Sequence, residues 1–274
     1  MSGRMKPGFL MVNGALAVLA AATLFPLVWM VSASLMAPGE ASNFPPPLLP
    51  ADPTLANYRE LFAAKGIGRQ AANSLLVAVL ATLLSLAFNL SAGYAFAKLQ
   101  FVGRERLFKL LLGALVIPGQ VTMMPLFLLL KQMGLVNTYA GALVPWLASI
   151  FGIFLVRQYA QSIPDDIIEA ARLDGASELR IFTSVVLPLL KPIVVTLAVL
   201  VFLGAWNDFM WPLIVLTDHD LQTLPVALAG LSREHVQDTE LMMAGSVLTV
   251  MPVLLLFLVL QRHYMKGLLM GSVK

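Results

Sequence analysis

The sequence predicts an all-α membrane protein with six spanning helices. Its composition is the first reason, because 59% of the 274 residues are hydrophobic and only 12% are charged. Soluble globular domains contain roughly 45–50% apolar and about 25% charged residues, so a water-soluble fold could not cover this much apolar surface. The spacing of the charges is the second reason, because apolar stretches long enough to cross a bilayer lie between them.

The predicted spans follow from these stretches in chain order. A spanning helix needs about 20 predominantly apolar residues. Five stretches of that size between flanking charges contain no charge, and a sixth, residues 192–217, is interrupted only at Asp208. The first stretch follows Arg4 and Lys6 and mimics a signal peptide, but it is about twice as long as the apolar region of such a peptide. We therefore interpret it as a retained span. The predicted spans cover residues 9–35, 72–97, 108–130, 139–160, 190–217 and 241–262.

The positions of lysine and arginine predict the orientation of the chain, because basic residues accumulate in cytoplasmic loops. If the N-terminus is cytoplasmic, all but five of the 18 basic residues fall in inner segments. Both termini are therefore expected in the cytoplasm. No internal repeat is visible, so residues 1–274 are predicted to form a single domain. The five outer basic residues are Arg59, Lys65, Arg69, Lys131 and Arg233.

The same composition excludes several classes of function. The net charge is only +3 and the basic residues are spread among loops, whereas a nucleic-acid-binding face needs them concentrated. The chain has no cysteine, which excludes disulfides and thiolate metal sites. His219, His235 and His263 lack the spacing of metal ligands, so we expect no metal site.

The third predicted span contains two prolines that indicate a bend. Pro118 and Pro125 lie in it, with Gly119 and Gln120 directly after the first. Sharp kinks in helices arise mainly at such residues, so a bent or locally unwound helix is expected. A hinge or gate at this bend is a hypothesis.

The connection between the fourth and fifth spans, residues 161–188, is predicted to hold a short helix, a turn and a second helix. Ser162 can cap the first helix, Pro164 fits its first turn, and acidic residues follow at the positive end of the helix dipole. Gly175 is a natural left-handed stop and Ser177 can cap the second helix. The first helix presents a narrow face of small side chains, which offers lipid little apolar area but permits close docking to a protein.

Part of this connection has a fixed spacing: E-A-A, three residues, Gly, nine residues, then V-V-L-P. The pattern resembles the EAA loop of binding-protein-dependent ABC importer permeases, with Val185 where the family has isoleucine. In that family the loop forms a coupling helix that sits in a cleft of the ATP-hydrolysing subunit. The residues that the resemblance assigns to this contact are Glu169, Ala170, Ala171, Asp174, Gly175, Leu187 and Pro188.

The resemblance extends over essentially the whole chain. The segment 205–213 is similar to the fifth span of the carbohydrate branch, and the tail 265–274 is similar to its C-terminus. The chain thus resembles the smaller permease of the maltose-type importers, which implies a type I permease with a MetI-like core. It also implies a bacterial or archaeal inner membrane and four kinds of partner: a second homologous permease, two ATP-binding cassette ATPase subunits, an extracytoplasmic solute-binding protein and the lipid bilayer.

No cofactor is expected in this chain, and we do not expect it to be an enzyme. The phosphate-binding pattern G-x-x-x-x-G-K-[ST] is absent from the sequence. ATP and Mg²⁺ are therefore expected on the partner subunits.

Polar groups within the spans are candidates for the substrate path, because such groups are costly in lipid and usually face the bundle interior. Asp208 is the sharpest, since 17 residues of helix from Lys191 place it about 25 Å away, towards the outer half of the bilayer. Asn207 adds a donor and an acceptor beside it, and Trp206 offers a face on which a sugar ring can stack. Asn89 and Gln120 are further candidates. The alternative is that Asp208 and Asn207 satisfy a helix break, and that Asn89 and Gln120 form helix–helix hydrogen bonds.

The sequence therefore predicts the transmembrane subunit of an ATP-driven importer that moves a sugar by alternating access. One alternative is an importer permease for another polar solute, such as glycerol-phosphate, an amino acid or a peptide. Another is a secondary transporter, which would need ionisable residues buried mid-membrane and often has an internal repeat.

Overall fold

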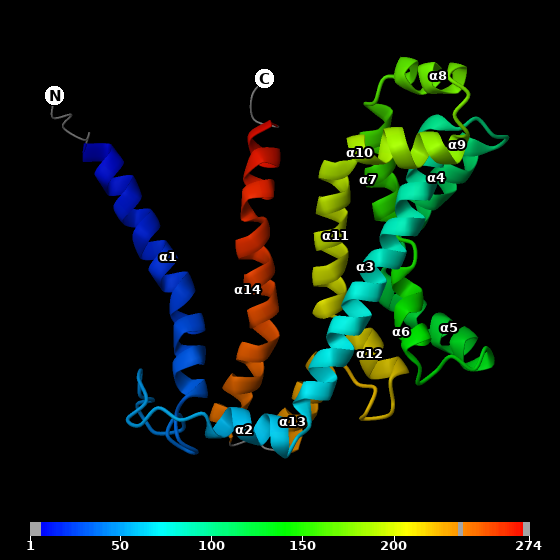
Figure 1. Ribbon diagram of the computed structural model, residues 1–274. Helices are drawn as coiled ribbons and strands as arrows, with labels where there is room; N and C mark the ends of the chain where they lie inside the picture. The colour runs from blue at the N-terminus through cyan, green and yellow to red at the C-terminus, as the bar shows by residue number, and fades with distance from the viewer. Residues whose placement is uncertain (1–6, 235–237, 271–274) are drawn as a thin grey trace. The chain divides into compact units, whose positions relative to one another are not determined.

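The computed structural model describes residues 7–234 and 238–270. This part of the chain is helical and has no strand (Figure 1). Three helices are long and apolar enough to cross a membrane, and three further pairs, each bent at a short break, pass the same test together. Six spans result if each bent pair is one span. The predicted all-α membrane fold is confirmed.

The three unbroken helices are the first, second and last spans. The bent pairs differ in their angles, which are 104°, 45° and 82° in chain order. The unbroken helices are α1 (Pro7–Ser34), α3 (Ile67–Lys98) and α14 (Thr239–Met270). The bent pairs are α4 (Arg104–Ala114) with α5 (Gly119–Gln132), α6 (Tyr139–Leu143) and η1 (Val144–Trp146) with α7 (Ile150–Gln161), and the segment Glu178–Leu189 with α11 (Lys191–Trp206).

The contacts divide the chain into two compact units. One comprises the described residues up to Gly68 together with Ala227–Gln261. The other comprises Arg69–Val226 and the described residues from Arg262 onwards. The prediction of a single domain stays a prediction. The ends of the chain, including Arg4, Lys6 and residues 271–274 of the predicted tail, lie outside the described residues, as does His235.

The first unit is built around the end of α1 and the start of α14, which come together in Figure 1. Ala33 and Met36 are fully buried there, and Met243 of α14 packs against them. The carboxylate of Glu240, itself fully buried, accepts a hydrogen bond from the backbone N–H of Ala41 at 2.6 Å. Asn57 of α2 (Ala56–Ala63) donates to the carbonyl of Met36, and Leu228 of α13 (Leu224–Glu234) lies beside Gly245 of α14.

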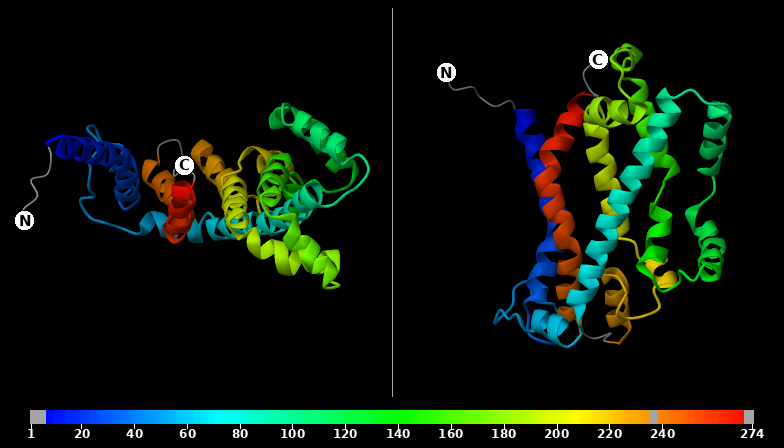
Figure 2. Two further views of the ribbon diagram at one scale, coloured as in Figure 1. Left: turned by 90° about the horizontal axis from the view of Figure 1, so that it is seen from above. Right: turned by 45° about the vertical axis from the view of Figure 1, so that its right-hand side comes forward.

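The second unit is organised along α3, which runs alongside α7 and α11 (Figure 2). A Cβ on Gly93 of α3 would lie 2.5 Å from the Cβ of Val156 on α7, so only glycine permits this approach. A Cβ on Gly204 of α11 would likewise lie 2.8 Å from the ring of Trp146. Small residues at such crossings let membrane helices pack backbone to backbone.

The bend predicted in the third span is confirmed. The helix α4 ends at Ala114, and α5 begins at Gly119 directly after Pro118. Proline has no N–H to donate and disfavours a helical residue before it, which explains why the break precedes Pro118. Pro125 is accommodated inside α5. The role of the bend as a hinge stays a prediction.

The fifth span departs from a continuous helix over residues 190–217. The helix α11 ends at Trp206, and the short helix α12 (Met210–Val215) follows after three residues. The break coincides with the polar pair Asn207 and Asp208.

Candidate coupling site and substrate path

The connection after α7 forms the predicted helix, turn and helix. The first helix is α8 (Asp165–Leu173). A continuous helical stretch follows it, made of α9 (Glu178–Arg180), the π-helix η2 (Ile181–Val186) and α10 (Leu187–Leu189). π-helical turns are rare and occur often at functional sites.

The start of α8 differs in one detail from the prediction. Ser162 does not cap α8, because it directly follows the last residue of α7 as its C-cap and its hydroxyl donates to the carbonyl of Tyr159 at 2.7 Å. Pro164 directly precedes α8 in an extended conformation. The prediction for Ser162 is wrong because only three residues separate α7 from α8, and the serine belongs to the end of α7.

The end of α8 follows the prediction closely. Gly175 has φ of +80°, its N–H donates to the carbonyl of Arg172, and the N–H of Ala176 donates to that of Ala171. This pair of hydrogen bonds is the Schellman ending, which favours glycine at the left-handed position. Ser177 then caps α9 by accepting from the N–H of Arg180.

One face of α8 is exposed, and the opposite face packs against the rest of the chain. Ile168 is 2% exposed and is the buried residue of this helix, whereas Leu173 is 89% exposed. The residues predicted to contact the ATPase are mostly on the open side: Glu169, Ala170, Asp174, Gly175 and Pro188 are exposed, and Ala171 and Leu187 are half-buried. Their role in the contact stays a prediction.

Ion pairs shift the pKa values of the acidic groups near α8. The hydrogen bond from Lys98 lowers the pKa of Asp165, and the hydrogen bond from Arg172 lowers the pKa of Glu178 and raises that of Arg172 itself. Because the pKa values of both acids are depressed, these contacts persist above the usual carboxyl pKa of about 4 and weaken only as the pH falls below it.

The candidate path residues in the fifth span satisfy the break between α11 and α12. The side chain of Asn207 donates to the carbonyl of Leu203 at 2.8 Å, and the carboxylate of Asp208 accepts from the N–H of Trp211 at 3.3 Å. Trp206 is buried and its ring stacks on Phe202. These contacts agree with the helix-break alternative, and a contact with substrate stays a prediction.

The two other path candidates lie in different settings. Asn89 is fully buried in α3, accepts from the N–H of Ser149 at 2.9 Å and donates to Ser85 at 2.7 Å. It thus stabilises the break that precedes α7, where the hydroxyl of Ser149 caps α7 by accepting a hydrogen bond from the N–H of Gly152. Gln120 is exposed in the first turn of α5. A role in the path stays a prediction for both.

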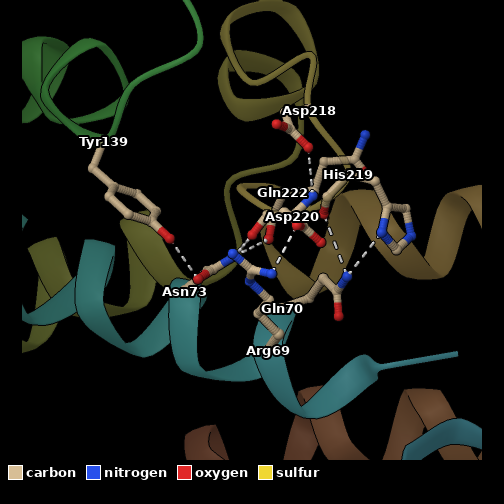
Figure 3. A network of polar contacts seen from close by, with 8 residues as sticks. All are labelled: Arg69, Gln70, Asn73, Tyr139, Asp218, His219, Asp220 and Gln222. Atoms are coloured by element: carbon tan, nitrogen blue, oxygen red, sulfur yellow. Dashed lines mark hydrogen bonds and ion pairs between the residues drawn. The ribbon is translucent and has the colours of Figure 1, made fainter.

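Sequence reasoning missed a polar network at the N-terminal end of α3 (Figure 3). The side-chain amide of Asn73 donates to the carbonyls of Asp220 and Gln222, each at 2.9 Å, and its oxygen accepts from the hydroxyl of Tyr139 at 2.7 Å. Arg69 pairs with the carboxylate of Asp220 at 2.8 Å. The network fixes the loop that follows the fifth span to α3.

Asn137 fixes the same loop from another side. It is a non-glycine residue with positive φ, at 60°, and its side-chain oxygen accepts from the N–H groups of Thr217 and Asp218. Its own N–H donates to the carbonyl of Val215. Asparagine tolerates the left-handed region better than most residues, but nothing in the sequence links it to a loop so far along the chain.

The fold and the exposed α8 define a multi-pass helical membrane protein with a helix presented outside its spans. Residues 89–269 match the family described as "Binding-protein-dependent transport system inner membrane component", and the chain belongs to this family. The resemblance found in the sequence is thereby confirmed.

Relatives and a solved structure match nearly the full chain. The arabinooligosaccharides transport system permease protein AraQ of Halalkalibacterium halodurans is 37% identical over 265 residues, which cover 94% of each chain. The melibiose/raffinose/stachyose import permease protein MelC of Bacillus subtilis is 33% identical over 261 residues, again 94% of each. A bacterial ABC transporter involved in the import of the acidic polysaccharide alginate has a chain that superposes with a TM-score of 0.83, at 26% identity, covering 95% of this chain and 99% of that one.

Proposed function

We propose that this chain is the transmembrane subunit of an ATP-driven importer, forms half of the translocation path and takes its driving force through α8. The observation that carries the proposal is the open face of α8, where Glu169, Ala170 and Gly175 are exposed in a member of this permease family. Small side chains let a partner approach the helix backbone closely. The partners that drive it are two ATPase subunits, which bind ATP and Mg²⁺.

The substrate proposed is a sugar, and an oligosaccharide in particular. Support comes from the names of AraQ and MelC, whose stated substrates are oligosaccharides, and from the polysaccharide that the transporter of known structure helps to import. A soluble binding protein delivers the sugar outside, and a second, homologous permease completes the path. Closure of the ATPase subunits moves α8 and converts the pore from outward to inward access.

The orientation that we propose for the chain follows from the proposed role of α8. An ATPase that uses cellular ATP must lie on the cytoplasmic side, so α8 and both termini face the cytoplasm. The distribution of basic residues supports the same orientation. The membrane is the inner membrane of a bacterium or an archaeon.

Two variants test the role of α8 in the complete transporter, reconstituted with its companion permease, ATPase subunits and binding protein. Gly175→Pro imposes φ near −65° in place of +80° and removes the N–H that bonds Arg172. We expect it to insert in the membrane but to abolish assembly with the ATPase or ATP-driven uptake. Unimpaired uptake by this variant would refute the role.

Gly134→Pro is the matched control. Gly134 also ends a helix with positive φ, at +71°, and its N–H donates to the carbonyl of Lys131, but it follows α5 in a different loop. The lesion to the backbone is therefore the same in kind. We expect Gly134→Pro to lower the amount of folded protein while the molecules that assemble still couple ATP hydrolysis to uptake.

A further inference from the structure

The helix α8 is joined to the end of α3 by a lysine that is almost completely buried. The ammonium of Lys98, the last residue of α3, donates to the carboxylate of Asp165 at 2.6 Å and to the carbonyl of Ile163 at 2.5 Å. The side chain of Lys98 is 5% exposed, whereas that of Asp165 is 74% exposed. The lysine thus holds both the first residue of α8 and the backbone just before it.

A second contact joins α3 to the other end of α8. Tyr94 is 4% exposed, and its hydroxyl donates to the carboxylate of Glu178 at 3.2 Å. The other oxygen of this carboxylate accepts from the guanidinium of Arg172, in the last turn of α8, at 2.6 Å. The ring of Tyr94 also packs against Phe182 of η2, with centroids 5.2 Å apart.

The two contacts share one face of α3. Tyr94 and Lys98 are four residues apart, so their side chains lie one above the other on the helix surface. One reaches the beginning of α8 and the other reaches its end through Glu178. An exposed ion pair contributes little to stability, but the α3 side of both contacts is buried. We call these residues, Tyr94, Lys98, Asp165, Arg172 and Glu178, the α8 clamp.

The covalent neighbours of α8 are less suited to carry a displacement across the membrane. The span before α8 is broken ahead of α7, and the segment after it is bent by 82° against α11. In contrast, α3 is one uninterrupted helix of 32 residues, which is about 48 Å long. Its other end is fixed to the loop after the fifth span through Asn73 and through Ser74, which accepts from the N–H of Leu224 at 2.7 Å.

We propose that α3 carries the movement of α8 across the membrane, and that Lys98 and Tyr94 are positioning residues that make the two helices move as one body. The proposal rests on the proposed function of α8 and adds the route by which its displacement reaches the far side. The clamp itself makes no contact with ATP or substrate.

The first test compares the number of substrate molecules imported for each ATP hydrolysed. It uses proteoliposomes that contain the complete transporter. Lys98→Met keeps a long side chain but removes its donors, and we expect hydrolysis to continue while the import-to-hydrolysis ratio falls by about fivefold or more. Lys98→Arg restores donors and is expected to recover most of the ratio. Lys109→Met is the matched control. Lys109 is exposed on α4, the helix that follows α3, and its replacement should leave the ratio unchanged.

A cross-link gives a second readout, which a purely structural role of Lys98 would not produce. The chain has no cysteine, so Lys98→Cys with Asp165→Cys creates a unique thiol pair. Without a reagent this variant lacks the ion pair and is expected to be uncoupled. Joining the thiols with a short bifunctional reagent should restore the ratio, because the proposal requires no relative movement of α3 and α8.

Several outcomes would overturn the proposal. These are a wild-type ratio for Lys98→Met, a normal ratio for the unlinked cysteine pair, or a cross-link that blocks import. If Lys98→Met fails to assemble, the cross-linked pair decides alone. Gly175→Pro is measured in parallel: if it too keeps a wild-type ratio, the proposed function of α8 fails, and if it alone uncouples the transporter, only the role of α3 fails.

Discussion

The backbone N–H of Ser149 donates a hydrogen bond to the side-chain oxygen of Asn89, 2.9 Å away, at the break that precedes α7. Asn89 is fully buried on α3, so an amide in the middle of one span supports the break in another. This hydrogen bond satisfies the N–H of Ser149 where the fourth span bends by 45°.

Asn89→Ala is expected to destabilise the protein by roughly 1–3 kcal/mol, the cost of leaving a buried donor unsatisfied. The melting temperature of the purified transporter measures the effect. Ser91→Ala serves as the control, because the Ser91 hydroxyl is exposed and only donates to a carbonyl of its own helix. Equal melting temperatures for the two variants would contradict this assignment for Asn89.

Gly93→Ala is expected to separate α3 from α7. The added Cβ would lie 2.5 Å from the Cβ of Val156, and overpacking of this kind costs typically 1–3 kcal/mol. Gly113→Ala makes the same change where nothing lies within 4 Å and should be neutral in the same melting experiment.

A compensating change sharpens this prediction. Val156→Ala removes the Cγ1, one of the two Val156 atoms that would lie 2.5 Å from the new Cβ, so adding it to Gly93→Ala should recover part of the lost stability. Additive losses in the double variant would show that the two positions are not in contact.

Asn73→Ala is expected to release the loop after the fifth span from α3. It removes two hydrogen bonds to the carbonyls of Asp220 and Gln222 and one from Tyr139. Hydrogen exchange of the backbone at residues 218–222 should therefore accelerate. Arg69→Ala is the comparison, because its ion pair with Asp220 is more than half exposed on both sides and such pairs contribute about 0–1 kcal/mol. Faster hydrogen exchange at residues 218–222 in Arg69→Ala than in Asn73→Ala would contradict this prediction.

Coupling is expected to be insensitive to pH between about 6 and 8 as far as Asp165 and Glu178 are concerned. The pKa values of both are lowered by their cationic partners, so they stay charged well below neutrality. The import-to-hydrolysis ratio measured across this range should be flat. A ratio that falls as the pH drops from 8 to 6 would argue against carboxylates as the anionic half of the α8 clamp.

The sequence predicted the parts of this fold that depend on local pattern. The gaps between charges predicted the spans, and Pro118 predicted the bend in the third span. Gly175 predicted the end of α8, because a left-handed residue at that position favours glycine. The EAA spacing placed α8 itself.

What the sequence did not predict depends on contacts between distant segments. Nothing near Asn73 indicates that its amide meets carbonyls about 150 residues later, and Lys98 looks like any basic residue at the inner end of a span. The sequence is compatible with Asn207 and Asp208 as path residues and as a helix break, and only the structure reveals which hydrogen bonds they make within the chain.

The most direct test of the central claim is the uptake of a labelled oligosaccharide into proteoliposomes that contain the complete transporter, with and without ATP on the ATPase side. We predict uptake only when ATP and the loaded binding protein are both present, and none from vesicles that contain this chain alone. Equal uptake by this chain alone, without ATP, would contradict the account.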